Sequence, residues 1–237
     1  MSTDGANTDR IQVGPITPRI PLDQVVAQGR CYMGISLDNP IFRGRTLTAL
    51  VQWAVGHFRQ CQVVVGDSLR RHNEQILQGL QGARAVDAAR AVGDAFLRDH
   101  KNLFDSFDHG RLQVIRWDEC LSWPEYRTDR KAIDDLYAGE TDFRSAVQRD
   151  AFAFVKRMKK RSSKLAVSDE QAIELSSQYL LEEIAVFSAL SMRSWSVELY
   201  PGPELEVLVK VASGAFARIP QGLRQRVNVE LKCVSET

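Results

Sequence analysis

Residues 31–67 read CYMGISLDNPIFRGRTLTALVQWAVGHFRQCQVVVGD, and this stretch decides the fold class. Its first apolar run, CYMGIS, predicts a short strand that the turn-forming residues at 38–40 bring to an end. Apolar residues then recur every three or four positions over 47–58, which is the spacing of an amphipathic helix. A second apolar run at 61–67 predicts a second buried strand. Strand, helix and strand in this order predict a βαβ unit with two neighbouring parallel strands.

The rest of the chain continues this alternation of strands and helices. Further strands are predicted at 112–117, 195–200 and 227–234. Helical patterns cover 73–107, 123–138, 142–160 and, after the cap Ser168, the residues up to about 190. We therefore predict a three-layer α/β domain over residues 29–237, with a mainly parallel five-stranded sheet and helices on both faces. Residues 1–28 are polar and rich in proline, which predicts a flexible leader.

The composition limits the class of protein. With 44% hydrophobic and 26% charged residues, the chain has the balance of a soluble globular protein with a substantial core. The formal net charge of +1 gives no global electrostatic reason to expect a nucleic-acid partner. The four cysteines lie far apart without neighbouring histidines, which excludes zinc-ligand spacing. The polar start and the lack of an apolar run of roughly 20 residues predict a cytoplasmic protein without a membrane segment.

The carboxyl ends of parallel strands meet at one edge of the sheet, and ligands of such folds bind there. Three groups are predicted at this edge: Ser36 after the first strand, Gly66–Asp67 after the second and Tyr200 at the end of the fourth. A serine at a strand-to-helix turn presents its hydroxyl near backbone N–H groups, which suits a nucleophile. An ordinary turn or cap serine has the same pattern. No histidine occurs late in the chain, so a serine-hydrolase triad is poorly supported.

Tyr179 and Glu183 form a second candidate group. Four residues apart on one predicted helix, they share a face and lie about 6 Å apart at Cβ. The neighbouring Glu182 is expected to point to solvent. A tyrosine beside a carboxylate can hold and deprotonate an ammonium group, although an ordinary surface pair has the same spacing.

Two clusters of positive charge are candidates for binding a phosphate backbone. Residues 156–164 hold six positive charges in nine residues, and Arg70-Arg71 follow the second strand. Such a block is also typical of a solvated surface. The chain has no GxGxxG after a strand, no GxxxxGKS/T and no HExxH, so neither a nucleotide cofactor nor a metal site is predicted.

Three motifs, in this order, resemble those of the cyclodipeptide synthase family. They are GISLDN (34–39) after the first strand, YLLEE (179–183) on a helix, and YP (200–201) at the end of a later strand. The similarity extends over residues 28–234. Two branches of the family carry different markers: Asn39 is like one branch, and the Tyr-Pro pair is like the other, to which we assign the chain.

The resemblance implies a Rossmann-like domain similar to the catalytic domains of class I aminoacyl-tRNA synthetases, monomeric and without a cofactor. It implies an enzyme that joins the amino acids of two aminoacyl-tRNAs into a cyclic dipeptide, a 2,5-diketopiperazine, by a ping-pong mechanism. Ser36 is then expected to carry first an aminoacyl and next a dipeptidyl group. Tyr179 and Glu183 are expected to hold the amino group, with Glu183 as proton acceptor, and Tyr200 to assist cyclisation.

The same resemblance assigns residues to substrate and tRNA binding. Gly34 and Asn39 of the turn are expected to contribute to an aminoacyl pocket. The lining of that pocket is expected to comprise Tyr32, Val64, Trp117, Val186 and Glu198. Contacts to the tRNA acceptor stem are expected from basic residues: Arg70, Arg71, Arg90, Arg98, Lys101, Lys156, Lys159, Lys160 and Arg161. A carboxylate at Glu198 would select a cationic or hydrogen-bonding side chain, unless it points away from the pocket.

Two other functions share these features. An aminoacyl-tRNA-dependent transferase that passes the amino acid to a different acceptor would need every group named above. A non-catalytic RNA-binding α/β module would need the basic residues but not the hydroxyl of Ser36.

Overall fold

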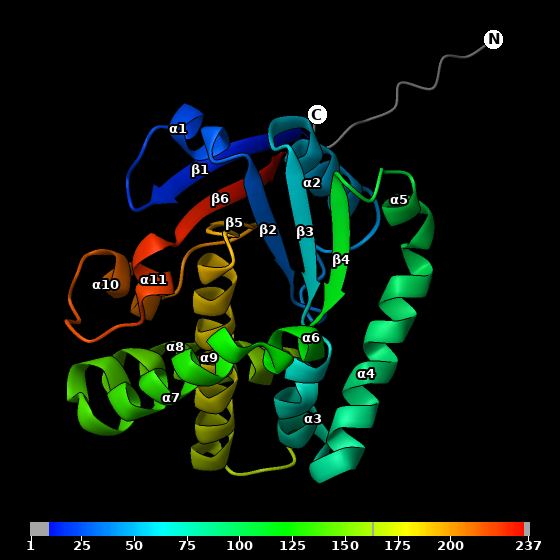
Figure 1. Cartoon of the computed structure of the whole chain (residues 1–237). Helices are drawn as coiled ribbons and strands as arrows, with labels where there is room; N and C mark the ends of the chain where they lie inside the picture. Colours follow the sequence, from blue (N-terminus) through cyan, green and yellow to red (C-terminus); the bar gives the residue numbers. More distant parts are fainter. Residues whose placement is uncertain (1–9, 163, 235–237) are drawn as a thin grey trace.

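The computed structural model describes residues 10–162 and 164–234 (Figure 1). Within these residues six strands form one sheet in the order β1-β6-β5-β2-β3-β4. The strands are β1 (Arg10–Thr17), β2 (Arg30–Ile35), β3 (Gln60–Val65), β4 (Leu112–Arg116), β5 (Val197–Tyr200) and β6 (Val227–Val234). Strand β1 pairs antiparallel with β6, and every other pair is parallel. The predicted α/β class with a mainly parallel sheet is therefore confirmed, with six strands instead of five.

The additional strand lies where a flexible leader was expected. Residues 10–17 form β1 and residues 22–27 form a short helix, so the leader prediction was wrong for this part of the chain; residues 1–9 lie outside the described residues. The alternation of β1 is interrupted at Gly14-Pro15, where its register against β6 shifts between Val13 and Ile16. Proline is tolerated at such a bulge on an edge strand because it has no N–H to donate to the ladder.

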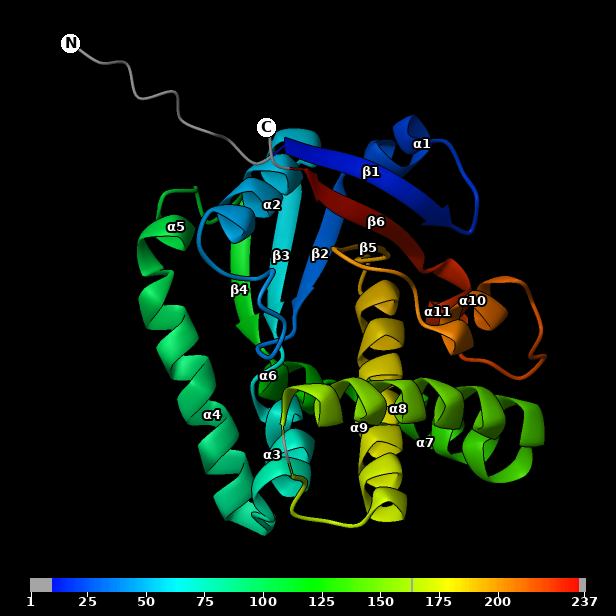
Figure 2. The same ribbon diagram turned by 180° about the vertical axis from the view of Figure 1, so that it is seen from behind.

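Helices cover both faces of the sheet (Figure 1; seen from behind in Figure 2). They are α1 (Leu22–Ala27), α2 (Gly44–His57), α3 (Arg71–Gln78), α4 (Gly82–Asp99), α5 (Lys101–Asp105), α6 (Trp117–Ser122), α7 (Pro124–Gly139), α8 (Thr141–Arg161), α9 (Asp169–Met192), α10 (Glu206–Ala212) and α11 (Gln221–Gln225), with a short 3₁₀ helix η1 (Ser68–Arg70). One continuous helix over 73–107 was expected, but the chain forms α3, α4 and α5. Gly79 explains the first break, because it ends α3 with φ 68°, a left-handed conformation that favours glycine.

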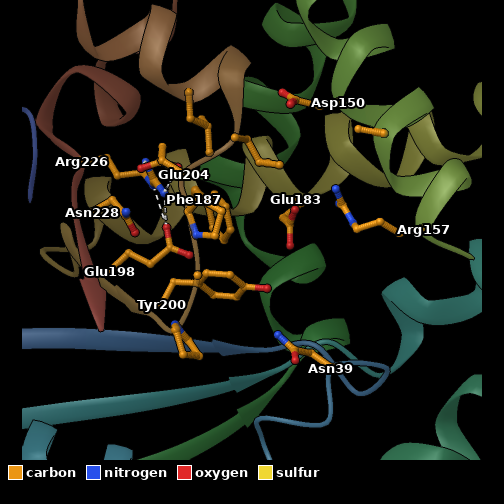
Figure 3. Close-up of a pocket in the computed structure, with 16 residues that line it drawn as sticks. Asn39, Asp150, Arg157, Glu183, Phe187, Glu198, Tyr200, Glu204, Arg226 and Asn228 are labelled. Atoms are coloured by element: carbon orange, nitrogen blue, oxygen red, sulfur yellow. Dashed lines mark hydrogen bonds and ion pairs between the residues drawn. The ribbon is translucent and has the colours of Figure 1, made fainter. Parts of the chain in front are cut away.

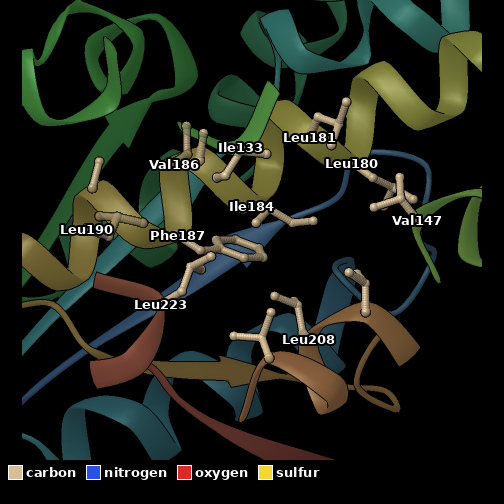
Figure 4. Packing of buried hydrophobic residues seen from close by; sticks show 14 of the residues in the cluster. Ile133, Val147, Leu180, Leu181, Ile184, Val186, Phe187, Leu190, Leu208 and Leu223 are labelled. Carbon is tan, nitrogen blue, oxygen red and sulfur yellow. The ribbon is translucent and has the colours of Figure 1, made fainter. Parts of the chain in front are cut away.

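Alternating residues of the strands enter two separate cores. Cys31 and Met33 of β2 pack with α2 on one face of the sheet. Tyr32 of β2 and Val64 of β3 pack on the other face with α9, whose buried side chains include Ile184 (Figure 4). Helix α9 also contacts α3, α7, α8 and α11, and its second half is buried on nearly every side. It is therefore a central helix, and its side chains are held rigidly over the sheet.

The order of the strands creates a crevice at the carboxyl end of β2. From β2 the chain proceeds to β3 and β4 on one side, and later returns to β5 and β6 on the other side. Strands β2 and β5 are therefore neighbours at a topological switch point, where open α/β sheets bind ligands. Ser36 directly follows β2 and Tyr200 ends β5. None of the described helices combines the length and apolarity needed to cross a bilayer.

Candidate active site

The turn after β2 fixes the position of Ser36. The Asn39 backbone N–H donates to the Ser36 carbonyl oxygen over 3.0 Å, which closes the turn. The Asn39 side-chain oxygen accepts from the Ile41 N–H at 3.2 Å. Asp38 anchors the outer side of the turn by accepting hydrogen bonds from Arg70 (2.9 Å) and Asn73 (2.7 Å). Ser36 therefore sits on a tightly held loop at the mouth of the crevice.

Helix α9 brings the predicted Tyr-Glu pair to this serine. The side chain of Ser36 lies next to the hydroxyl of Tyr179, and both residues line one cavity. Burial raises the pKa of the Tyr179 phenol well above its usual value, and the nearby Glu183 carboxylate raises it further. Phe154 of α8 stacks on the Tyr179 ring with centroids 6.1 Å apart, which orients the phenol. Ser36 and Tyr179 thus lie side by side, although about 140 residues separate them in the sequence.

Glu183 supplies a buried carboxyl group whose pKa is shifted toward neutral pH. Burial raises its pKa to about 8, and the neighbouring Glu198 carboxylate contributes in the same direction. Within the described residues its carboxylate accepts no hydrogen bond from the protein. A carboxyl group with a pKa of about 8 is matched to an α-amino group, whose ordinary pKa is about 7.7–8.0. It can therefore exchange a proton with a bound amine near neutral pH.

Tyr200 completes the group from the end of β5. Its hydroxyl lies next to the side chain of Asn39, which brings β5 beside the Ser36 turn. Burial raises the pKa of the Tyr200 phenol, and Glu183 raises it further. Phe42 packs edge-on against the Tyr200 ring, with centroids 6.0 Å apart. The phenol is therefore fixed next to Glu183 in its neutral, proton-carrying form.

Adjoining cavities meet around these residues. A cavity of about 190 Å³ is lined by Ser36, Tyr179, Glu183 and Tyr200. A larger cavity of about 380 Å³ shares Glu183 and Tyr200 and extends toward α10 and α11 (Figure 3). This is sufficient space for an aminoacyl group beside the serine.

The predicted aminoacyl pocket is only partly formed by the expected residues. Gly34, Val64, Trp117 and Glu198 line a narrow pocket of about 20 Å³ together with Ser36. Tyr32 and Val186, which were expected in the lining, do not line any of these cavities. Tyr32 is fully buried beneath the site, and its hydroxyl donates to Glu198 at 3.1 Å; Val186, on α9, packs in the core. Tyr32 therefore supports the pocket from behind, through Glu198.

Glu198 faces the cavities but is not isolated there. Arg226, which precedes β6, donates through Nε to Glu198 Oε2 at 2.8 Å. The same guanidinium donates to both carboxylate oxygens of Glu204, at 3.0 and 3.1 Å (Figure 3). Arg226 and Glu204 were missed in the sequence, because each resembles an ordinary surface charge and only the fold joins them. Arg157 of α8 belongs to the predicted basic segment 156–164 but was not assigned to a pocket, and it lines both larger cavities.

Glu182 does not point to solvent as expected. Its side chain is 4% exposed and accepts from the Trp117 indole N–H at 2.9 Å and from Arg71 at 2.9 Å. Arg71, expected to contact tRNA, therefore neutralises a buried carboxylate. The second half of α9 is buried on almost all sides. The helical period predicts which residues share a face, but it does not show that neighbouring helices cover the face that carries Glu182.

The other basic residues predicted to contact tRNA differ in whether their charged groups already pair with carboxylates of the protein. Arg70 is directed inward, to Asp38 and Glu74, so it also offers little to a partner. Several predicted tRNA contacts pair with surface carboxylates: Arg90 with Asp118, Lys101 with Asp105 and Lys159 with Asp169. Arg98 and Lys101 line a separate cavity beside β4, far along the sheet from Ser36.

Cations of α8 lie nearer to the site. Arg157 and Arg161 line the cavity that contains Ser36, and Lys156 and Lys160 are exposed on the same helix. Across residues 10–162 and 164–234, no cluster of three His, Cys, Asp or Glu side chains could hold a metal ion.

Comparisons with known proteins agree with this geometry. A family model described as cyclodipeptide synthase matches residues 12–200. The structure of a cyclodipeptide synthase from Fluoribacter dumoffii is 20% identical, with a TM-score of 0.79 over 97% of this chain and 100% of that chain. A cyclodipeptide synthase from Candidatus Glomeribacter gigasporarum, solved bound to Phe-tRNAPhe, is 15% identical, with a TM-score of 0.65 over 88% of each chain.

The fold is also similar to a class I aminoacyl-tRNA synthetase. Tyrosyl-tRNA synthetase from Archaeoglobus fulgidus is 13% identical, with a TM-score of 0.51 over 88% of this chain and 57% of that chain. No curated protein matches the sequence. The structural likenesses establish the fold, and the family model extends over most of the chain.

Proposed function

This chain belongs to the cyclodipeptide synthase family, and from that premise we propose that Ser36 carries both covalent intermediates of tRNA-dependent cyclic dipeptide synthesis. The observation that supports this most directly is the contact between the Ser36 side chain and the Tyr179 hydroxyl, beside Glu183, at the switch point of the sheet. An aminoacyl-tRNA is already an activated ester. The serine therefore needs positioning more than a strong base, which is consistent with cavities around Ser36 that no histidine of the described residues lines.

The first step transfers an aminoacyl group to the enzyme. The Ser36 Oγ attacks the ester carbonyl, a new Oγ–C bond forms, and the bond from that carbon to the terminal ribose oxygen breaks. The serine proton passes, through the adjacent Tyr179 hydroxyl, to the departing ribose oxygen. The free tRNA leaves, and the amino acid stays bound as an ester of Ser36.

The second step uses the amino group of the bound amino acid. Glu183 and Tyr179 hold this group, and Glu183 accepts its proton, because the pKa of the carboxyl is raised to about 8 by burial. The amine attacks the ester carbonyl of a second aminoacyl-tRNA, a peptide bond forms, and the bond to the terminal ribose oxygen breaks. Glu183 passes the proton taken from the nitrogen to this oxygen, and the second tRNA leaves. The terminal amine of the dipeptide then attacks the Ser36 ester, and the bond from the carbonyl carbon to Oγ breaks. The Tyr200 phenol gives its proton to Oγ and receives the proton that the amine loses, and the cyclic dipeptide is released.

The exposed cations of α8 suit the acceptor stem of the tRNA. Arg157 and Arg161 line the Ser36 cavity, and Lys156 and Lys160 extend the positive surface away from it. Each phosphate that such a cation neutralises releases counterions, which makes binding dependent on salt. Lys156→Glu with Lys160→Glu should weaken tRNA binding and lower the slope of log affinity against log salt by about 2.

The control for this test is Lys131→Glu on α7, an exposed lysine at a distance from the cavities. Its affinity and salt slope should match those of the wild type. Equal effects of the α7 and α8 substitutions would contradict a tRNA surface on α8.

Product analysis tests the function as a whole. The chain is expressed in a bacterium, and the culture medium is searched for diketopiperazines by mass spectrometry, with Ser36→Ala as the control. We expect products that disappear in the variant. An acylated acceptor other than a second amino acid would indicate the transferase alternative, and RNA binding without any product would indicate the binding-module alternative.

A further inference from the structure

A row of polar residues crosses the sheet face beneath α9. In register across neighbouring strands lie Gln62 on β3, Tyr32 on β2, Glu198 on β5 and Asn228 on β6. All of them are nearly inaccessible to solvent; Glu198 is 3% and Asn228 2% exposed. A core position that faces a helix is normally apolar, because burying polar groups without partners costs free energy. Such a row therefore needs an explanation beyond packing.

Two members of the row present unpaired polar atoms to the 380 Å³ cavity. The Asn228 side chain lines this cavity and makes no hydrogen bond to any of the described residues. Glu198 uses Oε2 for Tyr32 and Arg226, and its Oε1 accepts nothing from the protein within the described residues. Glu198 Oε1 lies 3.9 Å from where a Cβ on Gly34 would be, so it is directed toward the Ser36 turn. Glu198 Oε1 and the Asn228 amide, which can accept as well as donate, belong to side chains that are more than nine-tenths buried, and both residues line the cavity.

The charge around them is not balanced. The single positive charge of Arg226 is shared between the carboxylates of Glu198 and Glu204, which leaves one negative charge on the group. The guanidinium N–H groups are directed to these two carboxylates, so little donor capacity is left for a ligand. Asp150 and Arg157 of α8 also line the cavity and add one charge of each sign, so they leave this imbalance unchanged. Beside the row, a ligand group with a negative charge would therefore be repelled, and a donor would be attracted.

Apolar groups form another part of the wall. Phe187 of α9, Leu208 of α10 and Leu205, which directly precedes α10, line the cavity, while Asp150 and Arg157 of α8 add polar groups to it. The cavity thus combines hydrocarbon surface with an acceptor-rich floor. This combination suits a side chain with an apolar stem and a polar end.

We propose that one of the two amino acids joined by this enzyme has a side chain that ends in hydrogen-bond donors and has no negative charge, such as an amide, guanidinium or ammonium group. The row formed by Glu198 and Asn228, with Arg226 and Glu204 behind it, recognises this group. The inference rests on the proposed synthase function and names a substrate class for it. An apolar side chain would leave the floor of the cavity without partners, and sites that lose hydrogen bonds in this way discriminate strongly against such ligands.

The test measures side-chain preference with purified full-length enzyme. Initial rates of cyclic dipeptide formation are measured with preformed aminoacyl-tRNAs of four classes: basic, neutral amide, aliphatic and acidic. For at least one of the two positions, the wild type should prefer donor-ended over aliphatic side chains on the order of 100-fold, and acidic ones should give no product. Both rates in this ratio are measured with the same enzyme preparation. The fraction of folded enzyme therefore cancels, and a partly unfolded variant does not distort the ratio.

Two variants and a control connect the preference to the row. Asn228→Leu and Glu198→Gln should each lower the ratio of the rate with donor-ended side chains to the rate with aliphatic ones by about tenfold. The control is Gln62→Leu, because Gln62 belongs to the same row but lines none of the cavities around Ser36; its ratio should equal that of the wild type.

The outcomes separate the two proposals. Products composed of aliphatic residues at both positions, or unchanged ratios in Asn228→Leu and Glu198→Gln, would overturn the substrate inference and leave the synthase function standing. No cyclic dipeptide from any class of aminoacyl-tRNA, or an unaffected Ser36→Ala variant, would overturn the synthase function and this inference with it.

Discussion

Replacing Glu183 with glutamine should remove the dependence of cyclic dipeptide formation on pH between 6 and 9. Burial raises the pKa of this carboxyl to about 8, so the ionised form that can accept a proton is the minor form at neutral pH. With a pKa of about 8, about one tenth is ionised at pH 7 and about nine tenths at pH 9. The rate of the wild type at low substrate should therefore rise about tenfold over this interval.

The assay follows initial rates with preformed aminoacyl-tRNA, corrected for spontaneous hydrolysis of the ester at each pH. Glu183→Gln should be slower by 100-fold or more and show a flat profile, since removing a positioned general base typically costs about 10²–10⁴ in rate. The matched control is Glu174→Gln, an exposed residue of the same helix, which should retain the wild-type profile. A flat profile in the wild type, or a rise that persists in Glu183→Gln, would refute this role.

Stability should respond to the same pKa with a defined sign. The carboxyl is protonated in the folded protein up to a pH of about 8 but ionises near pH 4.5 in the unfolded chain, so the folded state binds the extra proton between these values. The wild type should therefore lose unfolding free energy from this group as the pH rises from 5 to 8, by up to about 4 kcal/mol. Glu183→Gln should lack this loss, which urea denaturation at pH 5 and pH 8 measures; parallel curves would contradict the raised pKa.

Two further predictions concern the scaffold of the site, and both are checked by urea denaturation. Arg71→Ala leaves the carboxylate of Glu182 buried without its cation and should cost about 3–5 kcal/mol, whereas Arg90→Ala, which breaks an exposed pair, should cost less than about 1 kcal/mol. Similar losses would argue against a buried ion pair. A Cβ at Gly222 would lie 2.1 Å from a backbone oxygen of α9, so Gly222→Ala should cost about 3 kcal/mol; Gly56→Ala, in open space within α2, should stabilise by about 0.4–1 kcal/mol. Equal midpoints for the two alanines would contradict this packing.

Local patterns made the central residues of the site candidates, and the resemblance to the family singled them out. Ser36 follows a short apolar run that ends in turn-forming residues, and Tyr179 and Glu183 share one face of a predicted helix. The carboxyl edge of the sheet was expected to hold Ser36 and Tyr200. That the middle of α9 packs over this edge comes from the fold alone. Strand β1 was not predicted, because Gly14-Pro15 interrupts its alternation of side chains at the place where its pairing with β6 shifts.

Contacts over long sequence separations could not be predicted in this way. Glu198, Glu204 and Arg226 lie on three different segments, and their ion pairs depend on the placement of β5 beside β6. Glu182 was expected in solvent because it is a charged neighbour of a functional residue on a helix. The surrounding helices bury it together with Arg71, which removed a predicted tRNA contact as well.

The central claim is that the hydroxyl of Ser36 becomes an ester during the reaction. The most direct measurement incubates the protein with one kind of preformed aminoacyl-tRNA, quenches with acid and determines the intact mass, followed by mapping of the modified peptide. We predict a mass increase equal to one aminoacyl group, located on Ser36 and absent in Ser36→Ala. An unmodified protein that still forms cyclic dipeptide, or an adduct located on another residue, would contradict the account.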